Sequence, residues 1–256
     1  MYQNQDYEHD ITLKASMYDM LFQYYKYSNP EKAMMYYMKH VECMHQLANL
    51  EHQHGGYRAH QNNGGNMQQS YVRVFHASPN APNVDVYVNG QPILQNVAYK
   101  QVSDYIPVMP GDYQIIITPA GKQEAVLTKD VSVPANAAVT LAAAGKVENL
   151  QLVAYQDDIN PEMGKAKVRF IHLSPDAPNV DIAVAGGDVL FSNVGFTEAS
   201  DYITIPQTTV DIEVRPAGSN KAVLTLKGVK FENGQVYNVA AVGLVEGQPE
   251  LEALLL

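Results

Sequence analysis

The sequence contains HASPNAPNVD at residues 76–85 and returns to a near copy, HLSPDAPNVD, at residues 172–181. A proline fixes φ and lacks an amide donor, so a central strand cannot continue through it. We therefore expect the chain to turn a corner here, with one strand ending at the histidine and another starting after the asparagine. Two prolines lie three residues apart in each copy, namely Pro79 and Pro82, then Pro175 and Pro178.

The corner belongs to a longer tandem repeat. Aligned 96 residues apart, VRVFHASPNAPNVDVYVNG matches VRFIHLSPDAPNVDIAVAG. Further on, Ser103-Asp104-Tyr105 returns as Ser200-Asp201-Tyr202, and Pro119-Ala120-Gly121 returns as Pro216-Ala217-Gly218. A period of about 95 residues suits a small self-contained domain and is too long for a solenoid unit. We expect one domain at residues 70–160, called repeat 1, and a second at residues 161–256, called repeat 2.

Short β-strands are expected throughout both repeats. Residues 72–77 and 84–89 alternate in character, and Gly90 follows the second run. About seven such runs per copy, with turn residues every 8 to 12 residues and no helical period, are typical of an antiparallel sandwich. The predicted fold is mainly β, with two tandem immunoglobulin-like antiparallel β-sandwiches preceded by an N-terminal α-helical hairpin.

The hairpin is predicted over residues 1–54. Asp10 is a candidate cap for a helix over residues 11–27, and Ser28-Asn29-Pro30-Glu31 carries the signals of a second helix start. Apolar residues then recur at helical spacing until Gly55-Gly56. Residues 55–69 are rich in Gly, Asn and Gln, which predicts a flexible linker.

Composition excludes several classes of partner. The net charge of −10 and a pI near 5.2 argue against binding to nucleic acid or anionic lipid, because neutralising phosphates needs a basic surface. The chain shows no apolar run long enough for a membrane span and no signal-peptide pattern at its start. Cys43 is the single cysteine, so no internal disulfide is expected.

The histidine, serine and aspartate of the repeated stretch are also the residue types of a hydrolytic triad. They are His76, Ser78 and Asp85 in repeat 1, and His172, Ser174 and Asp181 in repeat 2. A hydrolase would also need a strained nucleophile elbow and an oxyanion hole, and neither is visible in the sequence. A buried imidazole needs hydrogen-bond partners, which the serine hydroxyl or the aspartate carboxylate could provide. We therefore interpret the motif as structural and predict no catalytic residue.

The repeated Ser-Asp-Tyr motif has two interpretations. Its aspartate, Asp104 or Asp201, could bind a cation or a sugar, or the Ser-Asp pair could form the turn at a strand entry. The second is favoured, because one carboxylate is too few for a hard-cation site. Calcium binding through Asp157-Asp158 is a weaker alternative of the same kind.

Six of the eight histidines lie in the first 60 residues. Glu42 and His45 have the spacing that places a carboxylate and an imidazole on one helix face, as in di-iron bundles, although the segment offers too few acids for such a site. Zinc or copper is a second possibility, but the spacing fits no closed zinc pattern, and exposed or interfacial histidines are favoured. The candidate metal ligands are Glu42, Cys43, His45 and His52, with His40 nearby.

The N-terminal segment also carries more Tyr and Met than one face of a two-helix hairpin can bury. Surplus apolar surface on a small unit indicates packing against a partner. We therefore expect a homo-oligomer formed through residues 11–54, or docking of this segment to another protein.

The motif V-R-V-x-H-A-S-P-x-A-P-x-V-D, followed by V-x-V-N-G, resembles the start of the bacterial domain-of-unknown-function family 4397, and the second copy matches equally well. The resemblance covers residues 72–256 and implies an all-β surface module without established enzymatic activity. The N-terminal segment, with its S-N-P-E helix start, is loosely similar to the coat F type domain of endospore-forming bacteria. That similarity implies a spore coat location, which would explain a surface protein without an export signal.

Together these features predict a non-enzymatic structural protein of a bacterial envelope layer, with the spore coat as the predicted location and the hairpin as anchor. Its expected partners are other surface or coat proteins, and neither a cofactor, nor nucleic acid, nor a membrane is implied. One alternative is an adhesion module that binds carbohydrate or protein. The other is a metal-binding protein that uses the His-rich hairpin.

Overall fold

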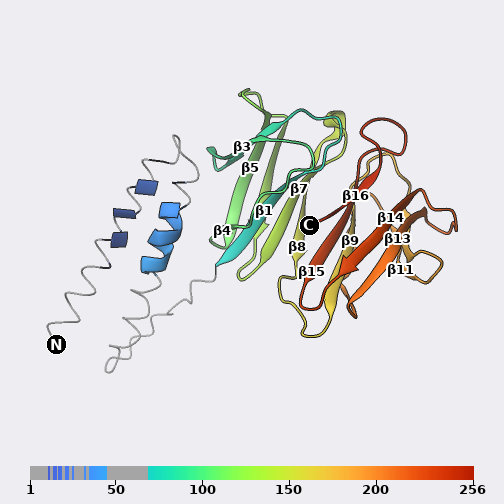
Figure 1. The fold of residues 1–256 in the computed structure, drawn as a ribbon. Coiled ribbons are helices and arrows are strands. Elements are labelled where there is room, and N and C mark those ends of the chain that lie inside the picture. The colour runs from blue at the N-terminus through green and yellow to red at the C-terminus, as the bar shows by residue number, and fades with distance from the viewer. Residues whose placement is uncertain are drawn as a thin grey trace. The chain divides into compact units, whose positions relative to one another are not determined.

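A computed structural model describes residues 69–256 throughout. Nearer the N-terminus it describes residues 11, 14, 15, 17, 18, 21, 22, 25, 32 and 35–44. The chain divides into two compact units, Met1–Gly64 and Gly65–Leu256, and the second unit contains both repeats (Figure 1). The predicted linker at residues 55–69 lies outside the described residues, apart from Gln69.

Repeat 1 consists of two four-stranded sheets, with strand orders β4-β1-β7-β8 and β3-β2-β5-β6. A short 3-10 helix, η1, spans Val147–Asn149. The strands are β1 (Ser70–His76), β2 (Val84–Val88), β3 (Gln91–Val97), β4 (Ile106–Val108), β5 (Gly111–Pro119), β6 (Leu127–Val133), β7 (Ala138–Ala144) and β8 (Gln151–Asp157).

Repeat 2 has the same arrangement, with orders β12-β9-β15-β16 and β11-β10-β13-β14. The strands are β9 (Ala166–His172), β10 (Val180–Val184), β11 (Val189–Val194), β12 (Ile203–Ile205), β13 (Thr208–Pro216), β14 (Leu224–Phe231), β15 (Val236–Val242) and β16 (Glu252–Leu255). The proline corner joins β1 to β2 and β9 to β10, so in both repeats it carries the chain from one sheet to the other.

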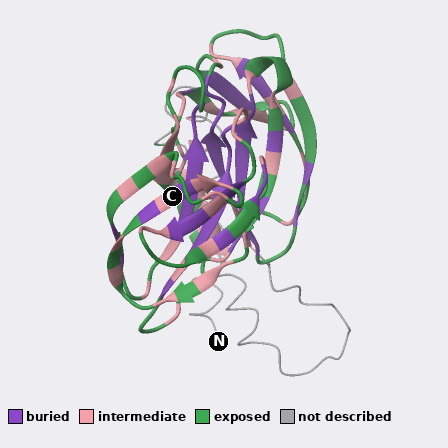
Figure 2. Cartoon of the chain, turned by 90° about the vertical axis from the view of Figure 1, so that its right-hand side faces the viewer, coloured by how far each residue is buried: buried purple, intermediate pink, exposed green. Residues whose placement is uncertain are grey.

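Each repeat has its own core between its two sheets. In repeat 1 the core includes Val74, Val86, Ile117 and Leu141, and in repeat 2 the equivalent cluster is centred on Phe170. These side chains come from alternate positions of their strands, because successive residues of a strand point to opposite faces. Figure 2 shows buried residues concentrated on the central strands, while the loops are largely exposed.

One pair of strands in each repeat departs from the predicted antiparallel, immunoglobulin-like form. β1 pairs in parallel with β7, from Tyr71 opposite Ala138 to His76 opposite Ala143, and β9 pairs in parallel with β15. Parallel neighbours need a long connection, and here the other strands of the repeat supply it. The prediction is therefore corrected: each repeat is a sandwich-like domain of one mixed and one antiparallel four-stranded sheet.

The second face of the β1-β7-β8 sheet is also buried, because it packs against the equivalent sheet of repeat 2. The cluster between the repeats includes Phe75 and Ala142 from repeat 1 and Ile171 and Ala240 from repeat 2, each 0% exposed. Strand β7, AVTLAAA, is buried at every position. Its alanines offer small side chains on both faces, and such strands read as continuous apolar runs.

The predicted two-helix hairpin is corrected to a single N-terminal helix. Among the described residues, a continuous helix is present only at 35–44, and the other described positions between 11 and 32 have helical backbone without forming a continuous described element. Apolar spacing favoured a helix in both segments, but spacing does not show how far a helix extends. A buried cluster in this unit joins Ile11 and Ala15 to Cys43.

Candidate functional site

The imidazole at each proline corner is fully engaged by the backbone of the corner. His76 is 1% exposed, its Nε2 lies 3.0 Å from the Pro82 carbonyl, and its Nδ1 accepts a hydrogen bond of 3.4 Å from the Ser78 amide. His172 repeats this with Pro178 at 3.1 Å and the Ser174 amide at 3.3 Å. A carbonyl can only accept, so Nε2 carries the proton and each imidazole is neutral.

Burial lowers the pKa of both histidines from 6.5, and the carbonyl hydrogen bond opposes this shift only in part. A protonated ring would place an N–H at Nδ1 against the amide that now donates to it. The neutral tautomer is therefore part of the folded corner.

The predicted partners of the imidazole are corrected by these contacts. The serine contributes its amide to the ring rather than its hydroxyl. Ser174 Oγ donates to the Gly243 carbonyl at 2.8 Å, whereas Ser78 Oγ is buried without a partner in the described structure. The aspartate of the motif also bonds elsewhere, so serine, histidine and aspartate do not form a relay.

Asp85 and Asp181 hold two other turns of their repeats. The Asp85 carboxylate accepts the Asn96 amide at 2.7 Å and the Gly121 amide at 2.9 Å. Asp181 does the same for Asn193 at 2.7 Å and Gly218 at 2.8 Å. Each asparagine has positive φ at an irregular point of strand pairing, and each glycine is that of the repeated Pro-Ala-Gly turn.

The residue between the prolines secures the loop that follows the last central strand. Asn80 Oδ1 accepts the Val147 amide at 2.8 Å, and its equivalent Asp176 accepts the amides of Val245 and Glu246 at 2.8 and 3.1 Å. Pro79 and Pro175 form the turn itself. Every polar group named in the motif, apart from the Ser78 hydroxyl, therefore has a structural partner.

The Ser-Asp-Tyr motif is a strand entry whose serine and tyrosine both have defined contacts. Ser103 Oγ accepts the Val74 amide and donates to the Asp104 carbonyl, both at 2.9 Å. Ser200 repeats this with Phe170 and Asp201. The tyrosines point instead to the boundary between the repeats.

A single carboxylate at this boundary joins the two repeats. Asp157, at the end of β8, accepts Thr140 Oγ1 at 2.5 Å and Tyr105 Oη at 2.6 Å from repeat 1. From repeat 2, Arg169 Nη2 donates to it in an ion pair, and Asn238 Nδ2 donates at 3.3 Å. We call this set, together with Arg73, the Asp157 cluster.

The arginines of the cluster are held in equivalent ways. Arg73 Nε donates to Thr140 Oγ1 at 2.8 Å and lies 3.8 Å from Asp157 Oδ2, while its guanidinium stacks 4.8 Å from the centre of the Tyr105 ring. Arg169 stacks on Tyr202 at the same distance. The Asp157 side chain is 1% exposed, so its charge is compensated by these groups rather than by water.

The calcium alternative for Asp157-Asp158 does not fit these contacts. Asp157 is surrounded by protein donors, and Asp158 pairs with Lys167 Nζ at 2.6 Å. No contact between the repeats was predicted from the sequence, because strand alternation does not show what covers the outward face of β1. The signal was present: the outward residues Phe75 and Ala77 are apolar.

The candidate metal ligands of the N-terminal unit are only partly described. Glu42 is exposed and Cys43 is 7% exposed within an apolar cluster, so these neighbours point in different directions. His45 and His52 lie outside the described residues. His40 Nδ1 lies 2.9 Å from the Ala15 carbonyl. Within the described parts of the chain, no group of three or more His, Cys, Asp or Glu side chains is placed to hold a metal ion.

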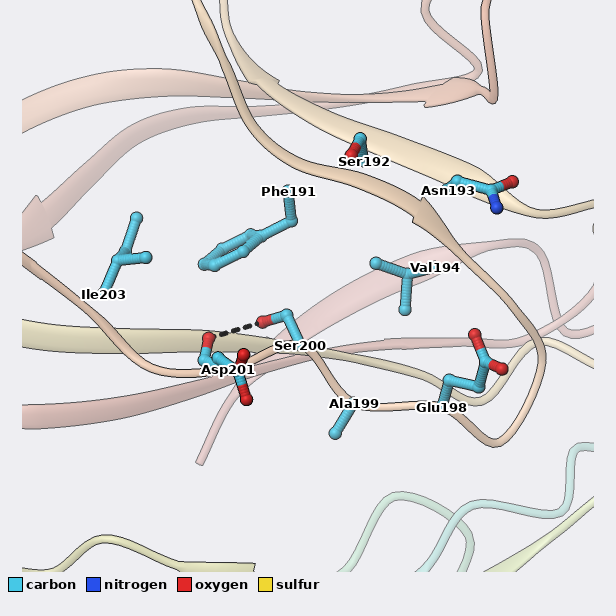
Figure 3. A pocket seen from close by; sticks show the side chains of 9 residues that line it. All are labelled: Phe191, Ser192, Asn193, Val194, Glu198, Ala199, Ser200, Asp201 and Ile203. Atoms are coloured by element: carbon cyan, nitrogen blue, oxygen red, sulfur yellow. Dashed lines mark hydrogen bonds between the residues drawn. The ribbon is translucent and has the colours of Figure 1, made fainter.

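An open cavity of about 380 Å³ lies in repeat 2 between β11 and the segment that enters β12. Figure 3 shows Phe191, Val194 and Ile203 directed into it, with Asn193 and the carboxylates at its rim. The rim carboxylates belong to Glu198, whose Oε2 accepts the Gly195 amide at 2.8 Å, and to Asp201 of the Ser-Asp-Tyr motif.

The family model described as a domain of unknown function, DUF4397, matches residues 70–183 and again residues 180–256. The chain therefore belongs to the DUF4397 family and contains two tandem copies of its domain. The match does not extend to the N-terminal segment, and the predicted resemblance to coat F domains has no support. No curated protein matches the chain.

Several solved structures show a weak likeness. An α-glucan-recognising family 41 carbohydrate-binding module from streptococcal virulence factors is 14% identical over 71% of this chain and 96% of its own, with a TM-score of 0.23. A family 26 carbohydrate-binding module of Amy13K from Eubacterium rectale is 9% identical over 73% and 96%, with a TM-score of 0.25.

A leucine-rich repeat protein from Bacteroides thetaiotaomicron is 14% identical over 67% of this chain, with a TM-score of 0.19, and the match spans only 26% of that protein. With TM-scores this low, none of these likenesses bears on the function of the chain. In the described residues, no helix combines the length and apolar character needed to cross a membrane.

Replacing Asp157 with Asn is expected to lower the free energy of unfolding by about 3–5 kcal/mol, because two buried guanidinium groups lose their counter-ion. Chemical denaturation followed by intrinsic tyrosine fluorescence measures the change. Asp130→Asn, at an exposed carboxylate of β6, is the matched control and is expected to change stability by less than about 0.5 kcal/mol. Equal effects of the two substitutions would contradict the role of the Asp157 cluster.

Acidification below pH 6.5 is expected to destabilise the protein. The folded-state pKa of His76 and His172 lies below 6.5, so the unfolded chain binds more protons once the pH falls under that value. The stability contributed by the neutral rings is complete above pH 6.5 and is lost as the pH falls toward the lowered pKa. Urea unfolding at about pH 7.5 and about pH 5 measures this difference.

The His76→Gln, His172→Gln double variant separates the histidines from other titrating groups. A glutamine amide still offers a donor to the proline carbonyl but does not titrate. We expect lower stability at both pH values and a clearly smaller difference between them. A difference as large as that of the unmodified chain would show that the pH dependence arises elsewhere.

Proposed function

We propose that the protein is a non-enzymatic structural protein of a bacterial surface layer, in which the two DUF4397 domains form one stiff body. The observation that carries this proposal is the engagement of both ring nitrogens of His76 and His172 by the corner backbone. An imidazole in that state has no free nitrogen with which to accept a proton from a substrate or a nucleophile. The repeated corner motif, which has the residue types of a hydrolytic triad, therefore serves the fold.

The contact between the repeats supports the stiff-body part of the proposal. An apolar cluster and a buried ion pair fix one domain against the other, and Tyr155 Oη donates to the Thr197 carbonyl at 2.8 Å across the same boundary. Domains linked by a small polar contact move relative to each other by default. A buried, hydrogen-bonded contact of this kind favours a spacer that keeps its two ends at a constant separation.

The N-terminal unit is proposed as the anchoring or self-association element, through residues 11–54. Three of its described methionines are well exposed, with Met17 at 46%, Met35 at 42% and Met38 at 51%, while Met44 packs against the buried cluster. Flexible, polarisable methionine side chains suit a surface that docks onto another protein. The proposed partners are other copies of the chain and other surface or coat proteins.

The proposed location is a bacterial surface layer in general. The spore coat was inferred from the coat F resemblance of the N-terminal segment. The family match does not include that segment. The spore coat remains one instance of the proposed location.

Fluorescent fusions in the producing bacterium test this proposal. The full chain is expected to form a peripheral layer, and a fusion lacking residues 1–54 is expected to stay folded but lose that layer. A diffuse signal from the full-length fusion under growth and sporulation conditions would contradict the surface role. Unchanged localisation of the truncated fusion would contradict the anchor role alone.

The cavity of repeat 2 favours a second candidate, a module that binds carbohydrate or protein. Its lining combines the apolar Phe191, Val194 and Ile203 with the polar Asn193, Glu198 and Asp201, and ligand sites commonly mix apolar surface with a few polar groups. Repeat 1 has Leu94 and Gln101 where repeat 2 has Phe191 and Glu198, so the two domains offer different chemistry at this position.

A glycan array with the full chain tests this second candidate. If the cavity binds sugar, Asp201→Ala is expected to reduce binding at least about tenfold, which corresponds to the loss of one charge-assisted hydrogen bond. Asp104→Ala, the equivalent change in repeat 1, is the matched control and is expected to leave binding unchanged. Binding to no glycan, or equal loss in both variants, would remove the cavity as a sugar site.

A further inference from the structure

The two surfaces that meet between the repeats are built from equivalent positions. Repeat 1 contributes Phe75 and Ala77 after Arg73, and repeat 2 contributes Ile171 and Leu173 after Arg169. Strands β7 and β15 add matching pairs in the same register with β1 and β9, namely Ala142 and Ala144, then Ala240 and Val242. We call these two surfaces the repeat faces.

The repeat faces are too apolar to remain open in water. The buried members of the cluster are between 0% and 7% exposed, and separating the repeats would expose them all together. A contiguous apolar patch of this kind is a self-association surface whenever it is uncovered. Each face therefore needs a partner face whenever the repeats come apart.

The polar contacts specify which partner fits. Asp157 of repeat 1 must meet Arg169 of repeat 2, and Lys100 Nζ of repeat 1 meets Glu252 Oε1 of repeat 2 at 2.9 Å. A repeat 1 face is therefore complementary to a repeat 2 face. Nothing in these contacts requires the two faces to belong to the same chain.

We propose that the repeat faces also pair between two copies of the protein, so that repeat 1 of each chain docks on repeat 2 of the other in a domain-swapped dimer. Exchanging identical elements between protomers reproduces every contact of the closed chain, so it is a low-cost route to a dimer. This proposal concerns self-assembly of residues 70–256 and holds whether or not the chain lies in a surface layer.

The hinge of this exchange is the connector between β8 and β9, residues 158–165. It is mostly exposed, with Ile159 at 48% and Met163 at 96%. Two of its bonds are local, from the Asn160 amide to Asp158 at 2.9 Å and from Lys165 Nζ to Glu162 at 2.8 Å. Asp158 also contacts repeat 2, through Lys167 Nζ at 2.6 Å and Tyr202 Oη at 3.3 Å, and a swapped dimer forms these contacts again between the two chains.

Charge reversal across the boundary provides the test, because Lys100 and Glu252 lie at the rim with side chains 41% and 36% exposed. In a closed Lys100→Glu chain the pair is two acids, and in a closed Glu252→Lys chain it is two bases. A swapped dimer of one chain with the other restores an opposite-charge pair at both boundaries. A swapped dimer of either chain with itself restores neither.

Equal amounts of the two full-length variants are partly unfolded together, refolded at low salt and examined by native mass spectrometry. Random pairing would give as many heterodimers as homodimers, and we expect the ratio of heterodimers to homodimers to be about fivefold higher than that and to return to the random value at high salt. Monomers alone at high protein concentration, or dimers in statistical proportion, would overturn the proposal.

The control reverses the charges of an ion pair that lies inside one repeat. Lys230 Nζ and Glu232 Oε1 form an exposed ion pair at 2.5 Å, and both belong to repeat 2. Exchange between chains cannot restore that pair, so a mixture of Lys230→Glu and Glu232→Lys chains is expected to give statistical proportions. An equal heterodimer excess in this control mixture would show that the association does not use the repeat faces, and it would also overturn the proposal.

Discussion

The structure depends on a neutral imidazole that bridges the two sides of a proline corner. Two prolines remove backbone donors where the chain leaves one sheet for the other, and the carbonyl of the second proline lies within hydrogen-bond distance of the buried imidazole. The Nε2–H of His76 or His172 donates to that carbonyl, and Nδ1 accepts a hydrogen bond from the amide two residues further along the chain. Both repeats solve the same local problem with the same residue types.

The other polar residues of the repeated motif hold the turns and loops near that corner. Asp85 and Asp181 are the second residues of the strands after the corner. Their two carboxylate oxygens accept the amide of an asparagine with positive φ and the glycine amide of the Pro-Ala-Gly turn. The residue between the prolines secures the loop after β7 or β15. A short motif therefore holds the β1–β2 corner, the β5–β6 turn and the β7–β8 loop of repeat 1 and their equivalents in repeat 2.

The sequence predicted the tandem β-domains and the corner, because proline spacing and strand alternation are local properties. It did not predict the parallel pairing of β1 with β7, since alternation shows that a strand exists but not which strand lies beside it. The contact between the repeats was also missed. Strand β7 is apolar at nearly every position, which is typical of a strand buried on both faces, but such a run does not show what covers its second face. Only the structure shows that Arg73 pairs with Asp157, a residue distant in sequence.

The central claim is that the repeated imidazoles are architectural and neutral. Nitrogen-15 NMR of the ring nitrogens across the acid range tests it most directly, because it reports tautomer and protonation at each histidine. We predict that His76 and His172 carry their proton on Nε2 and stay neutral below pH 6.5, where an exposed histidine is largely protonated. Ordinary titration of either ring near pH 6.5, or a proton on Nδ1 with Nε2 free, would contradict the account and restore the motif as a candidate for catalysis.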